Sequence, residues 1–126
     1  MPESVLAFLE YFGASLVLLL AFVAVYVKCT PYDDFRLIEH DNTAVAIALA
    51  GAVLGFTIPV VSAIWFTRSL PEMLLWALIT CAVQLVLLVV LRRQARRIEE
   101  GHVASAVMVA TFSVATGLLC AASISA

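Results

Sequence analysis

The sequence IEHDNTAVA at residues 38–46 returns as IEEGHVASA at residues 98–106, 60 positions later. Each copy is a charged segment that runs directly into an apolar helix rich in small residues. Each copy also follows an apolar helix with bulkier side chains. Aligned without a gap, the two halves of the chain share further identities, among them Arg36/Arg96, Ala50/Ala110 and Ile64/Ile124. The pattern predicts a duplicated membrane hairpin.

Composition favours the same architecture. Of 126 residues, 64% are hydrophobic and 13% are charged, and the apolar residues form four runs near the ~20 residues that cross a bilayer. We expect an all-α membrane protein with a single transmembrane domain over residues 1–126, built as two parallel-oriented tandem hairpin repeats of about residues 12–67 and 70–126. The predicted transmembrane helices are Phe12–Cys29, Thr43–Thr67, Leu70–Leu91 and Val103–Ser125, with Met1–Tyr11 as an extra outer turn.

The basic residues are distributed unevenly between the predicted loops. Only Arg68 lies in the second loop, whereas the first and third loops hold the other basic residues, which are Lys28, Arg36, Arg92, Arg93, Arg96 and Arg97. Cytoplasmic loops carry the excess of Lys and Arg in membrane proteins. We therefore expect the first and third loops to be cytoplasmic and both termini to be periplasmic.

Helix-capping residues mark the predicted helix ends. The segment Thr30-Pro31-Tyr32-Asp33 is typical of a helix start and predicts a short interfacial helix through Ile38. Asp41 or Asn42 would then cap the second transmembrane helix, and Gly101 and His102 stand at the corresponding positions of the second copy. Ser69 and Glu72, three residues apart, predict a capping box at the start of the third.

Small residues recur at four-residue spacing on the second and fourth predicted helices. Gly51 and Gly55 form a GxxxG pair, and Pro59 lacks the N–H that would bond the carbonyl of Gly55, which predicts a kink. The matching row on the fourth helix is Ser113, Gly117, Ala121 and Ser125. Such rows let helix backbones approach closely in lipid, so these two helices are expected to form the interior or to bind other subunits.

Three polar residues are candidates for function within or next to the membrane. Gln84 lies near the midpoint of the third helix, where an amide needs a partner, so we expect it to face protein or water. A structural interhelical hydrogen bond is the favoured role, and a place along an aqueous path is the alternative. Asn42 and His102 are equivalent helix-cap positions, and two adjacent helix N-termini could also receive an anion or an anionic segment.

The charged loops show no pattern that defines a chemical site. The acidic first loop lacks metal-ligand spacing, and its residues are expected to remain solvated; they are Asp33, Asp34, Glu39, His40 and Asp41. The cluster Arg92, Arg93, Arg96 and Arg97 is expected to fix topology and contact anionic headgroups, or alternatively to dock an acidic cytoplasmic protein. No catalytic, metal-binding or cofactor-binding residue is predicted, and nothing suggests nucleic-acid binding.

Several ordered motifs resemble the YjfL-type family of small bacterial inner-membrane proteins of unknown function. They include Thr30-Pro31-Tyr32-Asp33, Ala50 to Phe56, Gln84, residues 98–106 and Gly117 to Ala122. The family usually has Gly where Asp41 stands and Asn where His102 and Cys120 stand. The resemblance implies a multi-pass protein of the bacterial inner membrane, in envelope-stress gene neighbourhoods, and no reaction follows from it.

Three classes of function are compatible with these features. We favour a non-enzymatic scaffold or accessory subunit that forms a homo-oligomer or joins a larger membrane complex. The alternative is a subunit of a homo-oligomeric channel or transporter, with Gln84, Thr57 or Asn42 along the path. An enzyme is not expected, because no nucleophile, base and metal set can be assembled from this sequence.

Overall fold

The computed structural model describes residues 2–30, 34–67, 69–91 and 93–125, and these residues form helices and short connections with no strand. The helices in chain order are α1 (Pro2–Cys29), α2 (Asp34–Glu39), α3 (Thr43–Thr67), α4 (Leu70–Val90), α5 (Arg93–Glu99) and α6 (Val103–Ser125). Four of them, α1, α3, α4 and α6, are long and apolar enough to cross a membrane. The predicted all-α fold with four membrane-spanning helices is confirmed.

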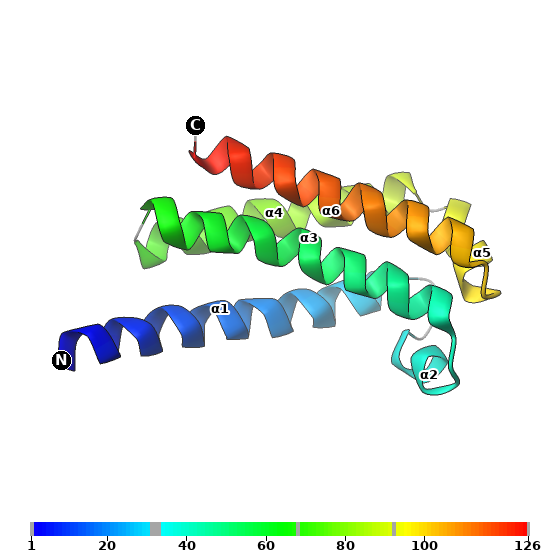
Figure 1. Ribbon diagram of the computed structural model, residues 1–126, viewed down its shortest axis with the longest axis horizontal. Helices are drawn as coiled ribbons and strands as arrows, with labels where there is room; N and C mark the ends of the chain where they lie inside the picture. Colours follow the sequence, from blue (N-terminus) through cyan, green and yellow to red (C-terminus); the bar gives the residue numbers. More distant parts are fainter. Residues whose placement is uncertain (1, 31–33, 68, 92, 126) are drawn as a thin grey trace.

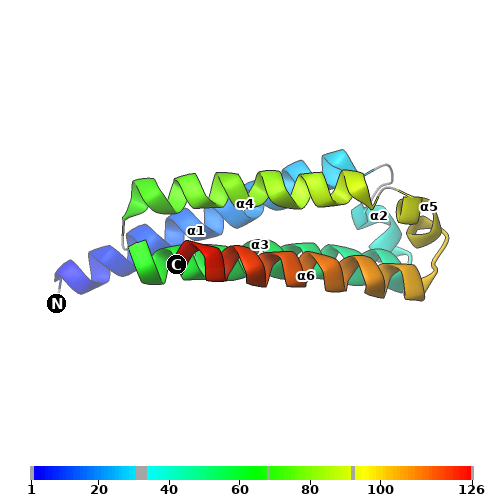
Figure 2. The same cartoon turned by 90° about the horizontal axis from the view of Figure 1, so that it is seen from above.

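The four long helices run side by side, and the two short ones lie together at one end (Figure 1). We call this end, which holds α2 and α5, the charged end, and we call the opposite end, where both termini lie, the terminal end. Seen from above, α3 and α6 form one layer and α4 lies behind them, with α1 crossing obliquely (Figure 2). The most extensive contact joins α3 to α6.

Helix α1 begins earlier than predicted. The sequence placed its start near Phe12, but the helix is continuous from Pro2, and Figure 1 shows that its first turns extend past the ends of the other helices. Pro2 suits the first turn of a helix, and nothing between Pro2 and Phe12 breaks one. Phe8 and Phe12 stack with ring centroids 5.4 Å apart. The start at Phe12 was wrong because it was copied from the shorter third helix.

The two short helices end in the same way, with a left-handed residue. Asp41 has a φ of 63° and Gly101 a φ of 93°, and in each case two N–H groups bond back to the last carbonyls of the helix. The Asp41 and Asn42 N–H groups bond the carbonyls of Ile38 and Leu37, and the equivalent groups of Gly101 and His102 bond those of Ile98 and Arg97. This is the Schellman arrangement, and it turns α2 into α3 and α5 into α6 without a linker.

Other predicted helix ends had mixed outcomes. The short helix through Ile38 is present as α2, although Pro31, Tyr32 and Asp33 lie outside the described residues. Ser69 is the N-cap of α4, but its side chain makes no cap hydrogen bond, so the predicted capping box with Glu72 is wrong. The extended backbone at Ser69 and the proline in the first turn suffice to begin α4.

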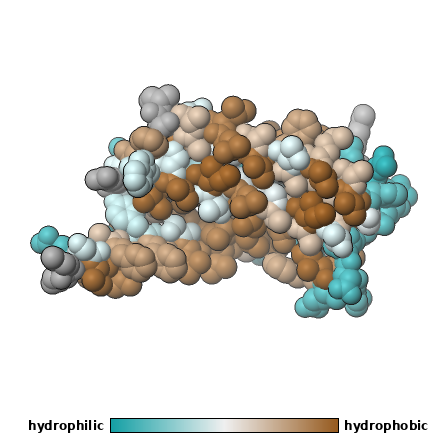
Figure 3. Space-filling model, viewed as in Figure 1, coloured by the Kyte–Doolittle hydropathy of each residue, from teal (hydrophilic) through white to brown (hydrophobic). Residues whose placement is uncertain are grey.

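Helix α3 is the most buried of the four spans and α1 the least. Phe22 of α1 stacks on Phe56 of α3 with centroids 4.4 Å apart, which holds the inner half of α1 against the bundle. Over the rest of the surface, large apolar side chains are exposed, as expected where lipid replaces water. Figure 3 shows the hydrophilic side chains gathered mainly at the charged end.

Candidate functional site

The tightest packing in the molecule lies where the small residues of α3 meet those of α6. A methyl group on Gly117 would lie 2.7 Å from the Cα of Gly55, and one on Gly51 would lie 2.9 Å from the carbonyl oxygen of Ala110. These distances leave no room for a side chain, so the two backbones are in direct contact. In lipid, close packing of this kind supplies much of the energy of helix association.

Pro59 changes the chemistry of this contact. It has no N–H to donate to the carbonyl of Gly55, and that carbonyl oxygen lies against the Cα of Gly117 on the neighbouring helix. A Cα–H group is a weak donor, and such contacts contribute about 0.5–1 kcal/mol each. Helix α3 continues through Pro59, because the carbonyl released inside the helix meets a partner on α6.

Gln84 reaches into the same junction from α4. Its side chain is 1% exposed, and its Nε2 donates a hydrogen bond of 3.1 Å to the backbone carbonyl of Ser113 on α6. A methyl group on Gly55 would lie 2.6 Å from that Nε2, so the missing side chain of Gly55 makes space for the amide. The environment expected of Gln84, buried and bonded to a small-residue helix, is the one found.

The amide of Gln84 is only half satisfied. Its Oε1 is buried and has no hydrogen-bond partner, although an unpaired buried acceptor costs roughly 1–3 kcal/mol. The other predicted small residue of this interface, Ala121, accepts a hydrogen bond of 2.8 Å from the hydroxyl of Ser62 on α3. Gln84, Gly55, Ser113 and Gly117 therefore form one buried centre where α3, α4 and α6 meet.

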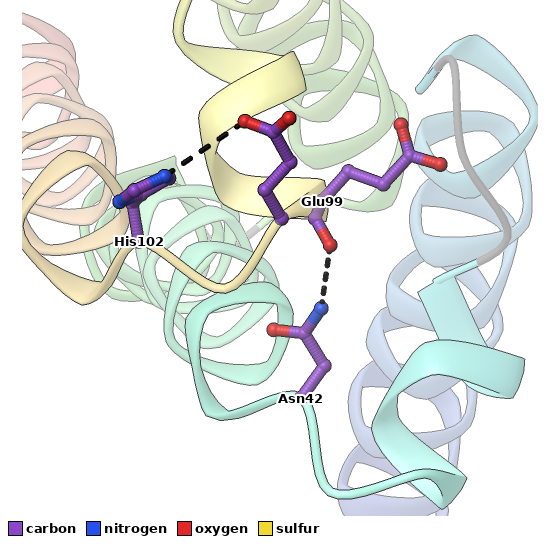
Figure 4. Close-up of polar contacts among 4 residues, drawn as sticks. Asn42, Glu99 and His102 are labelled. Carbon is purple, nitrogen blue, oxygen red and sulfur yellow. Dashed lines mark hydrogen bonds and ion pairs between the residues drawn. The ribbon is translucent and has the colours of Figure 1, made fainter.

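Asn42 and His102 lie far from this centre, at the charged end (Figure 4). The Oδ1 of Asn42 accepts the N–H of Val45 at 3.2 Å and caps α3, while its Nδ2 donates to the carbonyl of Glu99 at 3.0 Å. His102 stands at the equivalent position, and its Nε2 lies 3.8 Å from a carboxylate oxygen of Glu100. An anion at these two helix starts would meet that carboxylate, which argues against the anion-binding alternative.

A known family covers almost the whole chain. A family model described as Domain of Unknown Function (DUF350) matches residues 1–124. The chain belongs to this family. It is also 31% identical over 124 residues to the UPF0719 inner membrane protein YjfL of Escherichia coli strain K12 and to the protein of that name from strain O157:H7, with 95% of this chain and 94% of each relative covered. No solved structure matches.

The likeness to YjfL confirms the resemblance that the motifs predicted, and with the four apolar helices it makes this family member a multi-pass inner-membrane protein. It also gives the left-handed residues a meaning. Asp41 stands where the resemblance expects Gly, and a φ of 63° is a conformation that glycine adopts without strain. The equivalent position of the second copy, Gly101, is a glycine.

One polar cluster escaped the sequence analysis. Asp34 was expected to be solvated with the other acidic residues, but it is 2% exposed, and the hydroxyl of Thr30 donates to its Oδ1. The same hydroxyl contacts the carbonyl of Val27 at 2.9 Å, so Thr30 joins the end of α1 to the start of α2. The spacing of four between Thr30 and Asp34 was the available signal, and the run of acidic neighbours obscured it.

The remaining candidates are at the surface of the charged end. Arg96 and Arg97 are exposed on α5, whereas Arg92 lies outside the described residues and the side chain of Arg93 is not described. Among the residues with described positions, no group of three His, Cys, Asp or Glu side chains could hold a metal ion. The three cysteines are free.

Proposed function

We propose that this protein is a non-enzymatic scaffold or accessory subunit of the inner membrane that assembles through the outer face of α3 and α6. The observation that carries the proposal is an open groove of about 480 Å³ on this face. It is lined by apolar and small side chains, which are Ile47, Ala50, Gly51, Leu54, Ala110, Thr111, Val114, Ala115 and Leu118.

The physical argument rests on how helices associate in lipid. Acyl chains are as apolar as leucine, so only close packing and hydrogen bonds favour a helix over lipid. Small side chains at Ala50 and Ala115 make a hollow between the larger Leu54 and Leu118, both more than half exposed. A helix from a second copy or from a partner would pack there more closely than disordered acyl chains.

The cytoplasmic side of such a scaffold would be the charged end. Arg96 and Arg97 offer contacts to anionic headgroups or to an acidic cytoplasmic protein. An envelope-stress setting for this scaffold is suggested only by the family resemblance. The lipid bilayer is its medium, and no nucleic acid or cofactor enters the proposal.

Disulfide crosslinking between copies tests the assembly. Ala115→Cys in a chain with Cys29→Ser, Cys81→Ala and Cys120→Ala should give a crosslinked dimer in native membranes under mild oxidation. Val17→Cys in the same background is the matched control, because Val17 is 66% exposed on α1 and lies outside the groove. Equal crosslinking at the two sites, or none at Ala115→Cys, would count against this interface.

The duplication supports a view of both hairpins in one orientation. Hydrogen bonds recur at the 60-residue offset, from His40 N–H to the Arg36 carbonyl and from Glu100 N–H to the Arg96 carbonyl, each 3.1 Å long. We infer two parallel hairpin repeats, with the charged end cytoplasmic and both termini periplasmic. Arg68, the one basic residue predicted at the other side, lies outside the described residues.

A channel or transporter subunit is the second candidate. The observation that favours it is the buried Gln84, whose Oε1 lacks a partner near the middle of α4. Liposomes containing the purified protein separate the two candidates, since a scaffold gives no solute flux above that of empty liposomes.

A further inference from the structure

A second groove lies between α4 and α6, in the half of the bundle near the terminal end. Its volume is about 230 Å³, and half of its lining residues carry a hydroxyl or thiol group. These four are Thr80, Thr116, Cys120 and Ser123. The groove between α1 and α3 differs, because its hydroxyl residues, Ser15 and Thr57, both donate to carbonyls of their own helices.

The inner end of the α4–α6 groove approaches the buried amide. Thr80 is one helical turn before Gln84 on α4, and Thr116 is within one turn of Ser113 on α6. Thr80 and Gln84 are each 1% exposed, so this end is sealed from the bilayer. Beyond it lies the unpartnered Oε1 of Gln84.

The occupant must satisfy what the side chain lacks. The Nε2 of Gln84 is already bonded to the carbonyl of Ser113, so the need is for a donor to Oε1. An acyl chain has none. Buried polar atoms without a protein partner are commonly paired by water, which needs at least ~10–15 Å³ and two or more polar contacts.

We propose that the α4–α6 groove is a water-filled crevice, open toward the terminal end, from which water donates a hydrogen bond to the Oε1 of Gln84. Small neutral hydroxyl compounds share this chemistry and would enter the same space. The described residues that line the groove include no charged side chain, so ions are not favoured there. The crevice stops at the close contact of α3 and α6, and it therefore hydrates part of the membrane span without crossing it.

The native cysteines provide the test. Cys120 lines the groove, whereas Cys81 packs against the apolar cluster shared by α1, α3 and α4. Two single-cysteine proteins, one with Cys120 and one with Cys81, are reconstituted and treated with a charged, membrane-impermeant methanethiosulfonate. Because the thiolate forms only in contact with water, Cys120 should react about tenfold faster than Cys81 or more.

A lipophilic maleimide measures access from the lipid in the same two proteins. If acyl chains fill the groove, the maleimide reacts with Cys120 and the charged reagent does not, and the proposal is overturned. A further variant, Gln84→Leu, removes the amide at the inner end and should slow the charged reagent at Cys120 several-fold, while Leu87→Ile on the same helix should not. An unchanged rate in Gln84→Leu would show that the water does not reach Gln84.

Discussion

The side chain of Asn42 bonds the backbone carbonyl of Glu99, a residue 57 positions later in the chain. With its other polar atom, Oδ1, it caps α3. One amide therefore completes the start of a helix in the first half of the chain and holds the end of α5 in the second half. His102, its counterpart, has a side chain that is 51% exposed and does neither of these in the same way.

Asn42→Ala should lower the free energy of unfolding by about 1–2 kcal/mol, since it loses an N-cap and a hydrogen bond to α5. Asn42→Asp separates the two roles, because a carboxylate still caps α3 but cannot donate to Glu99. We expect an intermediate loss for Asn42→Asp and little effect for His102→Ala. Denaturant unfolding in detergent measures all three, and equal losses at Asn42 and His102 would contradict the asymmetry.

Gly117→Ala should be strongly destabilising. The added methyl group would lie 2.7 Å from the Cα of Gly55, and overpacking of this kind costs about 1–3 kcal/mol. Gly51→Leu and Gly55→Leu should be worse still. Gly13→Ala is the matched control, because a methyl group there meets nothing within 4 Å; it should be neutral or slightly stabilising. Similar melting temperatures for Gly117→Ala and Gly13→Ala would show that α3 and α6 do not touch.

Gln84→Leu should change stability little. Interhelical hydrogen bonds in membranes average about 0.6 kcal/mol, and the substitution also removes a buried oxygen that has no partner on the protein. Gln84→Glu should destabilise the protein by several kcal/mol, because a carboxylate there would be buried and could not donate to the carbonyl of Ser113. Flux measured on Gln84→Leu liposomes also tests the channel role, in which this change would abolish transport without affecting assembly.

Asp41→Gly should stabilise the protein by about 0.5–1 kcal/mol, because glycine adopts a positive φ at less cost than other residues. The complementary change, Gly101→Ala, should destabilise by a similar amount, since its backbone has a φ of 93°. Thermal unfolding of both variants checks the pair. If both move stability in the same direction, the left-handed turns are not responsible.

A reporter that is active only outside the cytoplasm should be active when fused after Ala126 and silent when fused near Ala95. The reason is the excess of basic residues in the first and third loops. The opposite pattern of activity would reverse the proposed orientation and would place α2 and α5 in the periplasm.

The elements that sequence reasoning found are those set by local chemistry. Four long apolar runs, the short helix through Ile38 and the capping position at Asn42 follow from hydropathy and hydrogen-bonding side chains alone. The four-residue spacing of the small residues around Gly55 and Gly117 was enough to indicate the closest helix faces. It did not indicate what those faces contact, since either other subunits or neighbouring helices could have matched these rows.

What escaped depended on contacts between distant segments. The burial of Asp34 follows from the packing of α2 against the bundle, and no acidic residue announces this in sequence. The bond from Asn42 to Glu99 needs the two halves to be side by side, which capping rules do not address. The early start of α1 was missed because the repeat suggested a length that the terminal end does not impose.

The partnership of α3 with α6 has a consequence for biogenesis. The second long helix leaves the ribosome well before the last one, yet its closest contacts are with the last one. Until α6 is synthesised and inserted, Gly51 and Gly55 face lipid or the insertion machinery rather than their final neighbours. Helix insertion and helix packing are thus separate events for this chain, and a ribosome stalled before residue 103 would leave an integrated but unassembled protein.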